Sequence, residues 1–247
     1  LAQITPITAC EARLFSKNDY TLYRTNNPLI GLSLLADITE RAPTFNLIPF
    51  ENLMDKEPIY SPFYLSLNNA ATVADAWQVL LGQEPTCLEW DNFPATSRHY
   101  INGFDLSNNS FRQTGNYLPH LQHAETWQPH DQTLHINLET LSIELPLPAD
   151  LLHKTLAYKL YLNSHSTLMM GRLGYFDGNM MLSLKPSNFK LIDRAIRYSQ
   201  FILRTRHQQD IDYKTLAEII FNEIESLEPN QSIVAKVVNR FTVETMC

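Results

Sequence analysis

Residues 63–90 read FYLSLNNAATVADAWQVLLGQEPTCLEW, and this stretch decides the expected fold class. Phe63–Leu67 is short, apolar and aromatic, which is typical of a buried strand. The next segment has apolar residues at helical spacing, with Thr72 as a candidate N-cap and Gly82 as a stop signal. Thr86–Trp90 has the composition of a second strand. A strand, a helix and a strand within about 30 residues are typical of a βαβ unit, so the sequence predicts an α/β fold with a parallel sheet.

The segments before this unit also contain strand and turn signals. Tyr20–Thr25 is rich in β-forming residues and ends at the turn pair Asn26-Asn27. Residues 29–38 are apolar at most positions, and periodicity does not distinguish a buried strand from a helix there. Residues 42–62 are punctuated by prolines and are expected to be mostly connection.

After the unit, the pattern changes from strands to helices. Leu134–Leu145 alternates apolar and polar residues, which predicts a strand followed by extended chain. Ala149–Leu173 has a helical pattern, and the glycines around Phe176–Asn179 predict a turn. The apolar residues that carry the helical pattern are Leu152, Leu156, Leu160, Leu168 and Met169.

Three more helices are expected at the C-terminal end. Pro186-Ser187 opens the first of them, and the others cover about Tyr213–Leu227 and about Ile233–Phe241. The basic residues of the first helix, among them Lys190 and Arg194, lie on its other faces. Its expected inward side chains are Phe189, Leu191, Ile192, Ala195, Ile196, Ile202 and Leu203.

Composition and charge exclude several classes of function. The 247 residues include 44% hydrophobic and 18% charged residues, with a net charge of −7. This charge argues against nucleic-acid binding, which needs a clustered basic surface, and against an anionic membrane surface. No apolar run approaches the ~20 residues of a membrane-spanning helix. The cysteines, Cys10, Cys87 and Cys247, are odd in number and far apart, which favours a reducing, cytoplasmic location.

Motifs for catalysis are weak. No nucleophile elbow, Walker loop or G-x-G-x-x-G sequence occurs, so the sequence predicts no bound cofactor. Asp37 with Glu40, or Glu89 with Asp91, could supply a carboxylate pair, but their spacing resembles that of solvated turn residues. A histidine-rich stretch has spacings that favour a polar loop over a metal site, so no metal is expected. Its residues are His120, His123, His130, Asp131 and His135.

The start of the helix after Pro186 is the most informative candidate site. Ser187 and Asn188 stand at the helix start, where exposed N–H groups and the helix dipole favour an anion. Lys190 lies one turn inside, and Arg194 follows it one turn later on the same face. These residues could hold a phosphate or a sugar phosphate, and the alternative is a capped surface helix with solvated basic residues.

Residues 156–195 contain several short motifs in order. They are LNSHSTLMMGRLG at 162–174, GNMM at 178–181, SNFKL at 187–191 and then Arg194-Ala195. This order resembles the sugar isomerase (SIS) family, in the group around N-acetylmuramic acid 6-phosphate etherase and the glucokinase regulatory protein. Their pattern is roughly N-x-x-S-T, a Gly-Lys, G-N-x-M and T/S-N-x-K-L-x-x-R-A. A weaker similarity, to the second SIS domain of the regulatory protein, begins at RAPTF, residues 41–45.

The resemblance implies an SIS-like three-layer α/β fold, with a mostly parallel sheet flanked by helices and followed by a small helical cap. Residues 1–184 would then form the SIS-like domain, and residues 185–247 the C-terminal helical segment. Several features depart from the family. Its glycine-rich strand-to-helix turn and its Ser/Thr phosphate cradle have no counterpart here, and Arg172 stands in place of the usual Lys. The segment with the etherase's catalytic glutamates has no match, so no catalytic residue is carried over.

The family resemblance implies a non-catalytic domain that binds a phosphorylated sugar, as a regulatory protein or as one half of a larger SIS protein. Ser187, Asn188, Lys190 and Arg194 would hold the sugar phosphate, with Lys190 as the strongest candidate. The expected partners are the sugar phosphate and either a second copy of the chain or a second SIS domain. Two alternatives remain open: a sugar-phosphate lyase or isomerase of the etherase type, and a degenerate SIS scaffold that binds another protein.

Overall fold

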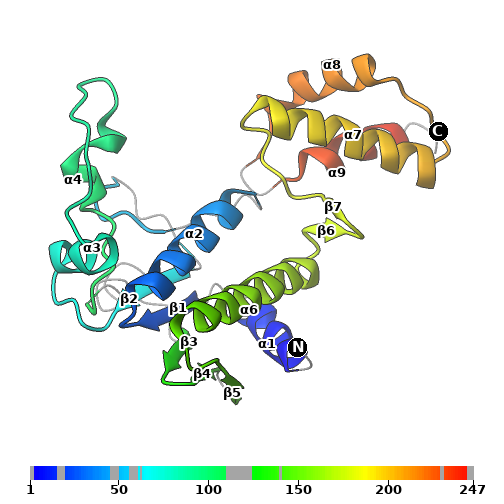
Figure 1. The fold of residues 1–247 in the computed structure, drawn as a ribbon. Coiled ribbons are helices and arrows are strands. Elements are labelled where there is room, and N and C mark those ends of the chain that lie inside the picture. The colour runs from blue at the N-terminus through cyan, green and yellow to red at the C-terminus, as the bar shows by residue number, and fades with distance from the viewer. Residues whose placement is uncertain are drawn as a thin grey trace. The chain divides into compact units, whose positions relative to one another are not determined.

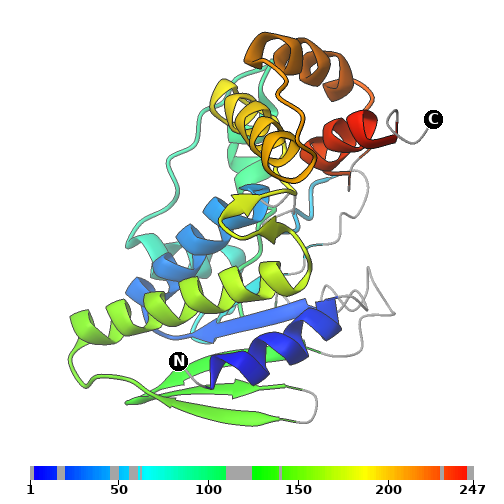
Figure 2. The same ribbon diagram turned by 90° about the vertical axis from the view of Figure 1, so that its right-hand side faces the viewer.

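The computed structural model describes residues 3–15, 20–44, 50–55, 61, 63–109, 124–138, 141–228 and 231–243. The chain divides into two compact units, whose elements are labelled in Figure 1 and seen from a second side in Figure 2. The first unit comprises Leu1–Arg41 and Ile48–Met169, and the second comprises Ala42–Leu47 and Met170–Cys247. The boundary expected after residue 184 falls inside the second unit, and as a domain boundary it stays a prediction.

The first unit is built on a five-stranded mixed sheet. β1 pairs in parallel with β2 on one side and with β3 on the other. The pairs β3–β4 and β4–β5 are antiparallel, so the expected mostly parallel sheet is correct only around β1. In spatial order the strands are β2 (Phe63–Leu67), β1 (Tyr20–Thr25), β3 (Ala124–His130), β4 (Thr133–Asn137) and β5 (Ser142–Pro146).

The parallel pairing uses other segments than the sequence predicts. Residues 29–38, which could be strand or helix, belong to α2 (Pro28–Thr44), which connects β1 to β2. Thr86–Trp90 is not a strand, and that prediction is wrong. Leu88 N donates to the carbonyl of Thr96 at 2.9 Å, and Thr96 Oγ1 donates back to the carbonyl of Leu88 at 2.9 Å. These hydrogen bonds satisfy the segment within a local loop instead of a sheet.

The helix after β2 confirms its predicted signals. α3 (Val73–Leu81) has a complete capping box: Asp75 N donates to Thr72 Oγ1, and Thr72 N donates to the Asp75 carboxylate. Gly82 ends the helix at φ 71°, a left-handed conformation that glycine adopts without steric cost. The loop beyond it contains the short helices η1 (Pro94–Thr96) and α4 (Arg98–Ile101).

Buried polar contacts join the helices of the first unit to its sheet. Glu11 of α1 (Ile4–Phe15) contacts His165 of α6 (Leu151–Arg172), and both residues are almost fully buried. Thr21 Oγ1 on β1 donates to the same Glu11 carboxylate at 3.0 Å. Lys159 Nζ of α6 donates to the buried carboxylate of Asp37 on α2 at 2.9 Å. Figure 1 shows α6 beside α1, as the Glu11–His165 contact requires.

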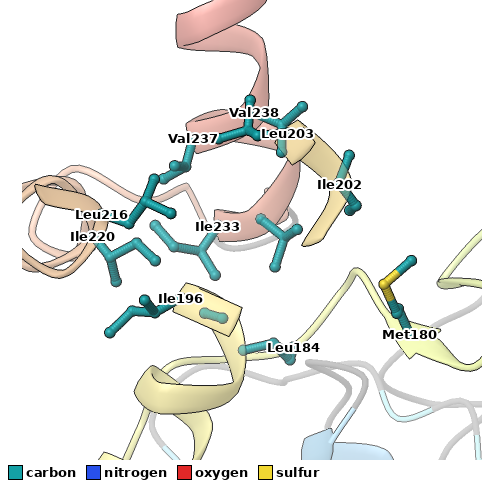
Figure 3. Packing of buried hydrophobic residues seen from close by; sticks show 12 residues of the cluster. Met180, Leu184, Ile196, Ile202, Leu203, Leu216, Ile220, Ile233, Val237 and Val238 are labelled. Carbon is teal, nitrogen blue, oxygen red and sulfur yellow. The ribbon is translucent and has the colours of Figure 1, made fainter. Parts of the chain in front are cut away.

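The second unit is a small helical bundle that follows a hairpin. The hairpin strands are β6 (Phe176–Asp177) and β7 (Met180–Met181), and Gly178 between them has φ 60°. The helices are α7 (Phe189–Arg206), α8 (Tyr213–Ile224) and α9 (Ile233–Val243), which confirms the predicted elements. Figure 3 shows their side chains converging on one apolar core, and its fully buried members include Ala195, Leu203, Leu216, Ile220, Ile233, Val234 and Val237.

One predicted core residue of the second unit is not in the core. The helical pattern predicts that Phe189 points inward, but its side chain is 84% exposed at the first position of α7. Ala195, Ile196, Ile202 and Leu203 are buried as expected.

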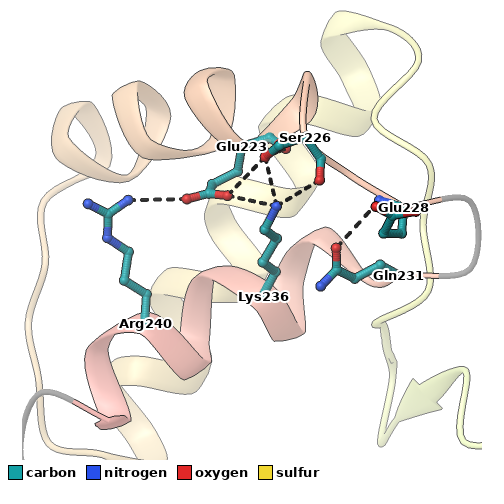
Figure 4. A network of polar contacts seen from close by, with 6 residues as sticks. All are labelled: Glu223, Ser226, Glu228, Gln231, Lys236 and Arg240. Atoms are coloured by element: carbon teal, nitrogen blue, oxygen red, sulfur yellow. Dashed lines mark hydrogen bonds and ion pairs between the residues drawn. The ribbon is translucent and has the colours of Figure 1, made fainter.

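A polar network joins α8 to α9 at the edge of this bundle (Figure 4). The Glu223 carboxylate contacts Lys236 Nζ at 2.8 Å and Arg240 Nη1 at 3.2 Å. Lys236 also donates to Ser226. The hydrogen bond and charge of Lys236 lower the pKa of Glu223. Throughout the described part of the chain, no helix has the length and hydropathy needed to cross a membrane.

Candidate functional site

A cleft of about 290 Å³ opens in the first unit where β1 and β3 end. β1 lies between two parallel neighbours, and its chain leaves the sheet at this edge to begin α2. In sheets with parallel strands, ligands bind outside the carboxyl ends, at the point where the strand order reverses. The cleft is lined by Thr25, Asn26, Asn27, Ile30, Pro129, His130, Asp131 and Lys154.

The turn from β1 into α2 uses its own polar groups. Asn27 Oδ1 accepts hydrogen bonds from Leu29 N at 3.0 Å and from Ile30 N at 3.2 Å. Asn27 N in turn donates to Thr25 Oγ1 at 3.0 Å, and Pro28 has no N–H to offer. The amides at the start of α2 are therefore satisfied internally. A ligand in the cleft would be recognised by side chains instead of a backbone phosphate cradle.

Three side chains supply the chemistry of the cleft. His130 Nδ1 lies 3.3 Å from the carboxylate of Asp131, and both side chains are largely exposed. Asp131 has φ 49°, a left-handed conformation that Asp tolerates in the tight turn between β3 and β4. Lys154, from the first turns of α6, forms no ion pair with any residue that the structure describes. One cation thus faces a group of hydrogen-bonding side chains.

A second, smaller cavity of about 20 Å³ lies between β2 and the segments around Phe50 and Phe104. Tyr64 Oη donates to Glu51 Oε2 at 3.0 Å across it. Burial raises the pKa of the Glu51 carboxyl, and the Tyr64 hydrogen bond opposes that shift. This cavity has room for about one water molecule and not for a larger ligand.

The histidine-rich stretch does not form a metal centre in the described part of the chain. His135 lies 3.3 Å from Glu144 on β5, and its ring centre is 6.4 Å from that of His130. No group of three or more potential metal ligands occurs among the described residues. His120 and His123 lie outside the described residues, so their part in the expectation is untested.

The two candidate carboxylate pairs have other partners. Asp37 is buried and bound to Lys159, and it links α2 to α6. Glu89 Oε1 accepts a hydrogen bond from Arg98 N at 2.8 Å and caps the start of α4. Both contacts are structural, so neither pair gains support as an acid–base pair.

The four predicted binding residues lie together around the start of α7. Asn188 Oδ1 accepts a hydrogen bond from Leu191 N at 3.0 Å, so this side chain caps the helix. Ser187 and Lys190 are exposed, and Lys190 has no acidic partner in the described residues. Arg194, one turn on, is half-buried, and Met181 Sδ, at 3.8 Å, is its hydrogen-bond partner among the described side chains.

The nearest carboxylate on α7 does not neutralise these cations. Asp193 accepts hydrogen bonds from Arg197 at 2.9 Å and from Tyr213 Oη at 2.8 Å. These two hydrogen bonds, with Arg197 as the larger contribution, lower the pKa of Asp193. Asp193 is therefore bound to Arg197 and Tyr213 and forms no ion pair with Lys190 or Arg194. The spacing of Lys190 and Arg194 on the helix fits the predicted anion site, whose use stays a prediction.

The sequence patterns do not predict the cleft. Asn26-Asn27 indicates only a turn, and His130 and Asp131 indicate only part of a polar loop. The available signal was the strand Tyr20–Thr25 followed at once by polar residues and a helix, which is the usual construction of a ligand site in α/β folds. The contribution of Lys154 comes from a helix far along the chain and had no local signal.

Comparisons with known proteins give a partial similarity. One stretch of 63 residues is 38% identical to N-acetylmuramic acid 6-phosphate etherase of Clostridium acetobutylicum, covering 26% of this chain and 21% of the relative. A stretch of 56 residues is 43% identical to the etherase of Staphylococcus epidermidis, covering 23% of this chain and 19% of the relative. The similarity thus spans about a fifth of the length of these relatives.

No family model matches the chain, and no solved structure shows a significant match. Part of this chain is therefore distantly similar to N-acetylmuramic acid 6-phosphate etherases, which are SIS-family proteins.

Proposed function

We propose that this protein binds a phosphorylated sugar through an SIS-like domain that does not itself catalyse a reaction. The observation that carries the proposal is the cleft at the end of β1, in which Lys154, with no ion pair among the described residues, faces neutral and acidic hydrogen-bonding groups. Its volume of about 290 Å³ is at the small end of ligand sites, which suits a single sugar ring. The partial similarity to the etherases supports a phosphosugar as the ligand class.

The cleft residues divide into two roles. Lys154 Nζ supplies the positive charge that a phosphate group needs. Asn26, His130 and Asp131 supply the donors and acceptors that sugar hydroxyl groups need. The α2 amides are already satisfied, and Lys154 is the one lysine or arginine among the lining residues of this cleft.

The start of α7 is the second proposed place for the phosphate. Ser187, Asn188, Lys190 and Arg194 combine a helix N-terminus with two cations that have no acidic partner among the described residues. This combination favours a phosphate over a neutral sugar. Here Lys190 is the residue on which binding would depend most, because it is exposed and has no acidic partner in the described residues.

One experiment tests the proposal and separates the two places. Thermal shift and calorimetry are measured with fructose 6-phosphate, fructose 1-phosphate, glucosamine 6-phosphate and N-acetylmuramic acid 6-phosphate, and with the same sugars lacking phosphate. The variants are Lys154→Ala for the cleft and Lys190→Ala for the start of α7. Lys214→Ala, an exposed lysine of α8, is the matched control.

Binding of at least one phosphosugar, lost in one of the two test variants and kept in Lys214→Ala, supports the proposal and identifies the place. A ligand at 100 times its dissociation constant stabilises the native state by about 2.7 kcal/mol. Binding at such a concentration would therefore raise the melting temperature measurably. No shift with any sugar phosphate would overturn the proposal. It would favour the degenerate SIS scaffold that binds another protein.

An etherase-type lyase is the second candidate function. It is favoured by the names of the two relatives and by the His130–Asp131 contact, since a histidine beside a carboxylate can act as a base. The test is release of lactate from N-acetylmuramic acid 6-phosphate. Lactate release that disappears in His130→Ala or Asp131→Asn would show catalysis and contradict the non-catalytic assignment.

A further inference from the structure

The lining of the cleft at the end of β1 is balanced in charge while its histidine is neutral. Lys154 carries one positive charge and Asp131 one negative charge, and the other lining residues are then uncharged. A phosphate monoester has a charge of about −1.5 to −2 at pH 7. A phosphosugar therefore needs more positive charge than the cleft has when His130 is neutral.

His130 is the lining residue that can supply this charge. Histidine gains or loses its charge between about pH 5 and 8. His130 Nδ1 lies 3.3 Å from the carboxylate of Asp131, and an ionised carboxylate only accepts protons, so Nδ1 carries the ring proton in this contact. A neutral His130 then has only the lone pair of Nε2 left for a ligand. A dianionic phosphate group has no proton to donate to that lone pair.

We propose that His130 is a phosphate-binding residue of the cleft and that it takes up a proton when the phosphate group binds beside Lys154. This inference rests on the proposed phosphosugar function and gives His130 a second, charge-dependent role in it. A protonated ring donates from both nitrogens, so Nδ1–H stays with Asp131 while Nε2–H is donated to a phosphate oxygen. Such charge-assisted hydrogen bonds are about twice as strong as neutral ones. The lining residues then have a net charge of +1.

The neighbouring histidines have acidic partners of their own. His135 on β4 shares one face of the β3–β4 hairpin with His130, and the two ring centres are 6.4 Å apart. His135 Nδ1 lies 3.3 Å from the carboxylate of Glu144, which is directly opposite on β5. His153 on α6 is bound to Asp150 at 2.8 Å. Among the described residues, His130 is the one histidine that lines the cleft.

The proposal determines the sign of the pH dependence. Because the ligand binds the protonated ring, its affinity rises as the pH falls, and binding removes protons from the solution. The phosphate group itself takes up a proton with a pKa of about 6, which would obscure this effect in acid. A sulfate ester keeps a single negative charge throughout this range and reports on the protein alone. The etherase-type alternative, in which His130 acts as a base, needs the neutral ring instead.

Titration calorimetry with two probes tests the proposal. Fructose 6-phosphate is used from about pH 7 to 8.5, where its phosphate group is mostly dianionic, and glucose 6-sulfate from about pH 6 to 8.5. Across the sulfate range, we expect the dissociation constant for the wild type to fall about 10-fold as the pH falls. In buffers of different ionisation enthalpy, binding of either probe at about pH 7.5 should take up about half a proton or more.

Three variants separate this inference from the proposed function. His130→Gln keeps hydrogen-bonding groups but does not titrate, so its binding should take up no proton and should lose the pH dependence. His135→Gln removes the adjacent titratable ring and is the matched control, which should keep both effects. Lys154→Ala tests the cleft itself and should abolish binding of both probes at every pH.

The outcomes are distinguishable. Binding that depends on Lys154 but takes up no proton in the wild type would overturn the role of His130 and leave the proposed function in place. Proton uptake that survives in His130→Gln would have the same meaning. If fructose 6-phosphate shows no Lys154-dependent binding at any pH, the cleft is not the phosphosugar site, and the inference fails with it.

Discussion

The two units stabilise their folds in different ways. In the first unit, buried ionisable residues cross the core: Glu11 contacts His165, and Asp37 binds Lys159. In the second unit no ionisable side chain is buried among the described residues, and the charged contacts of Glu223 lie at the edge. A buried pair is costly to break because one partner is left without compensation, whereas an edge contact is partly replaced by water. The units should therefore respond to mutation and to pH by different amounts.

The largest effect is expected for Glu11→Ala. Removal of this carboxylate leaves His165 buried without the acidic partner that the structure gives it, and loss of one member of a buried pair typically costs about 3–5 kcal/mol. Chemical denaturation followed by a probe in the first unit should show this decrease in the free energy of unfolding.

A matched double variant sharpens this test. In Glu11→Leu combined with His165→Leu, both polar groups are replaced together, and most of the lost stability should return. A decrease below about 1 kcal/mol in Glu11→Ala would mean that the pair is dispensable and that the contrast between the units is wrong.

The second-largest loss of stability is expected for Leu203→Ala in the second unit. This side chain is fully buried among α7, α8 and α9, and a leucine-to-alanine cavity costs about 2–5 kcal/mol. Hydrogen exchange should show faster exchange across α7–α9 and unchanged exchange in the β1–β2 pair. Phe201→Ala, at a 54% exposed position of the same helix, should change stability by no more than about 0.5 kcal/mol.

Loss of a helix N-cap can be compared between the two units, because each unit has a helix whose first turn is capped by a side chain. Thr72→Ala removes the cap of α3, and Asn188→Ala removes the cap of α7. Each should cost about 1 kcal/mol, because one amide at the helix start loses its acceptor. Thr72→Ser and Asn188→Ser should restore most of the loss. If either alanine variant melts at the wild-type temperature, its cap does not contribute to stability.

The smallest effect is expected for Glu223→Gln, and it depends on pH. Lys236 lowers the pKa of Glu223 below that of the unfolded chain, so the folded state favours the charged carboxylate. The resulting stability is complete above the unfolded pKa of about 4.3 and is lost as the pH falls through the lower folded value. The variant should be less stable than the wild type by about 0.5–1 kcal/mol at pH 7, and the difference should disappear at strongly acidic pH.

Arg240→Gln is the control for this pH effect. Arg240 contacts the same carboxylate but is about half exposed, and its contribution to the lowered pKa is smaller than that of Lys236. Its difference from the wild type should therefore be smaller at pH 7. A Glu223→Gln difference that stays constant with pH would show that the loss is one of packing and not of charge.

Local signals account for the elements that were predicted correctly. The two ends of α3 are set by Thr72 with Asp75 and by Gly82. Their hydrogen bonds and backbone conformation involve near neighbours only. The turn at Gly178 and the cap at Asn188 are also local. Such features depend little on the rest of the fold, so the sequence is sufficient to predict them.

The incorrect predictions depend on distant partners. Thr86–Trp90 has the composition of a strand, but its backbone is satisfied by Thr96 nearby, and β1 pairs with β3 instead. The leucines of α6 have the spacing of an amphipathic helix, yet the side that packs against the first unit is the one with Tyr158 and His165. The cleft joins Asn26, His130 and Lys154, and periodicity carries no information on which distant segments meet.

The position of β1 between two parallel strands has a consequence for folding. Its pairing with β2 joins residues about 40 positions apart, whereas its pairing with β3 joins residues about 100 positions apart, and Glu11 and His165 are separated by 154 positions. Contacts of such long sequence separation slow folding, because a large loop has to close before they form. During synthesis on the ribosome, the β1–α2–β2 segment emerges before β3 and α6. The edge of β1 that later pairs with β3 is uncovered during that interval. The nascent chain is then most prone to aggregation, and chaperone binding would have its largest effect.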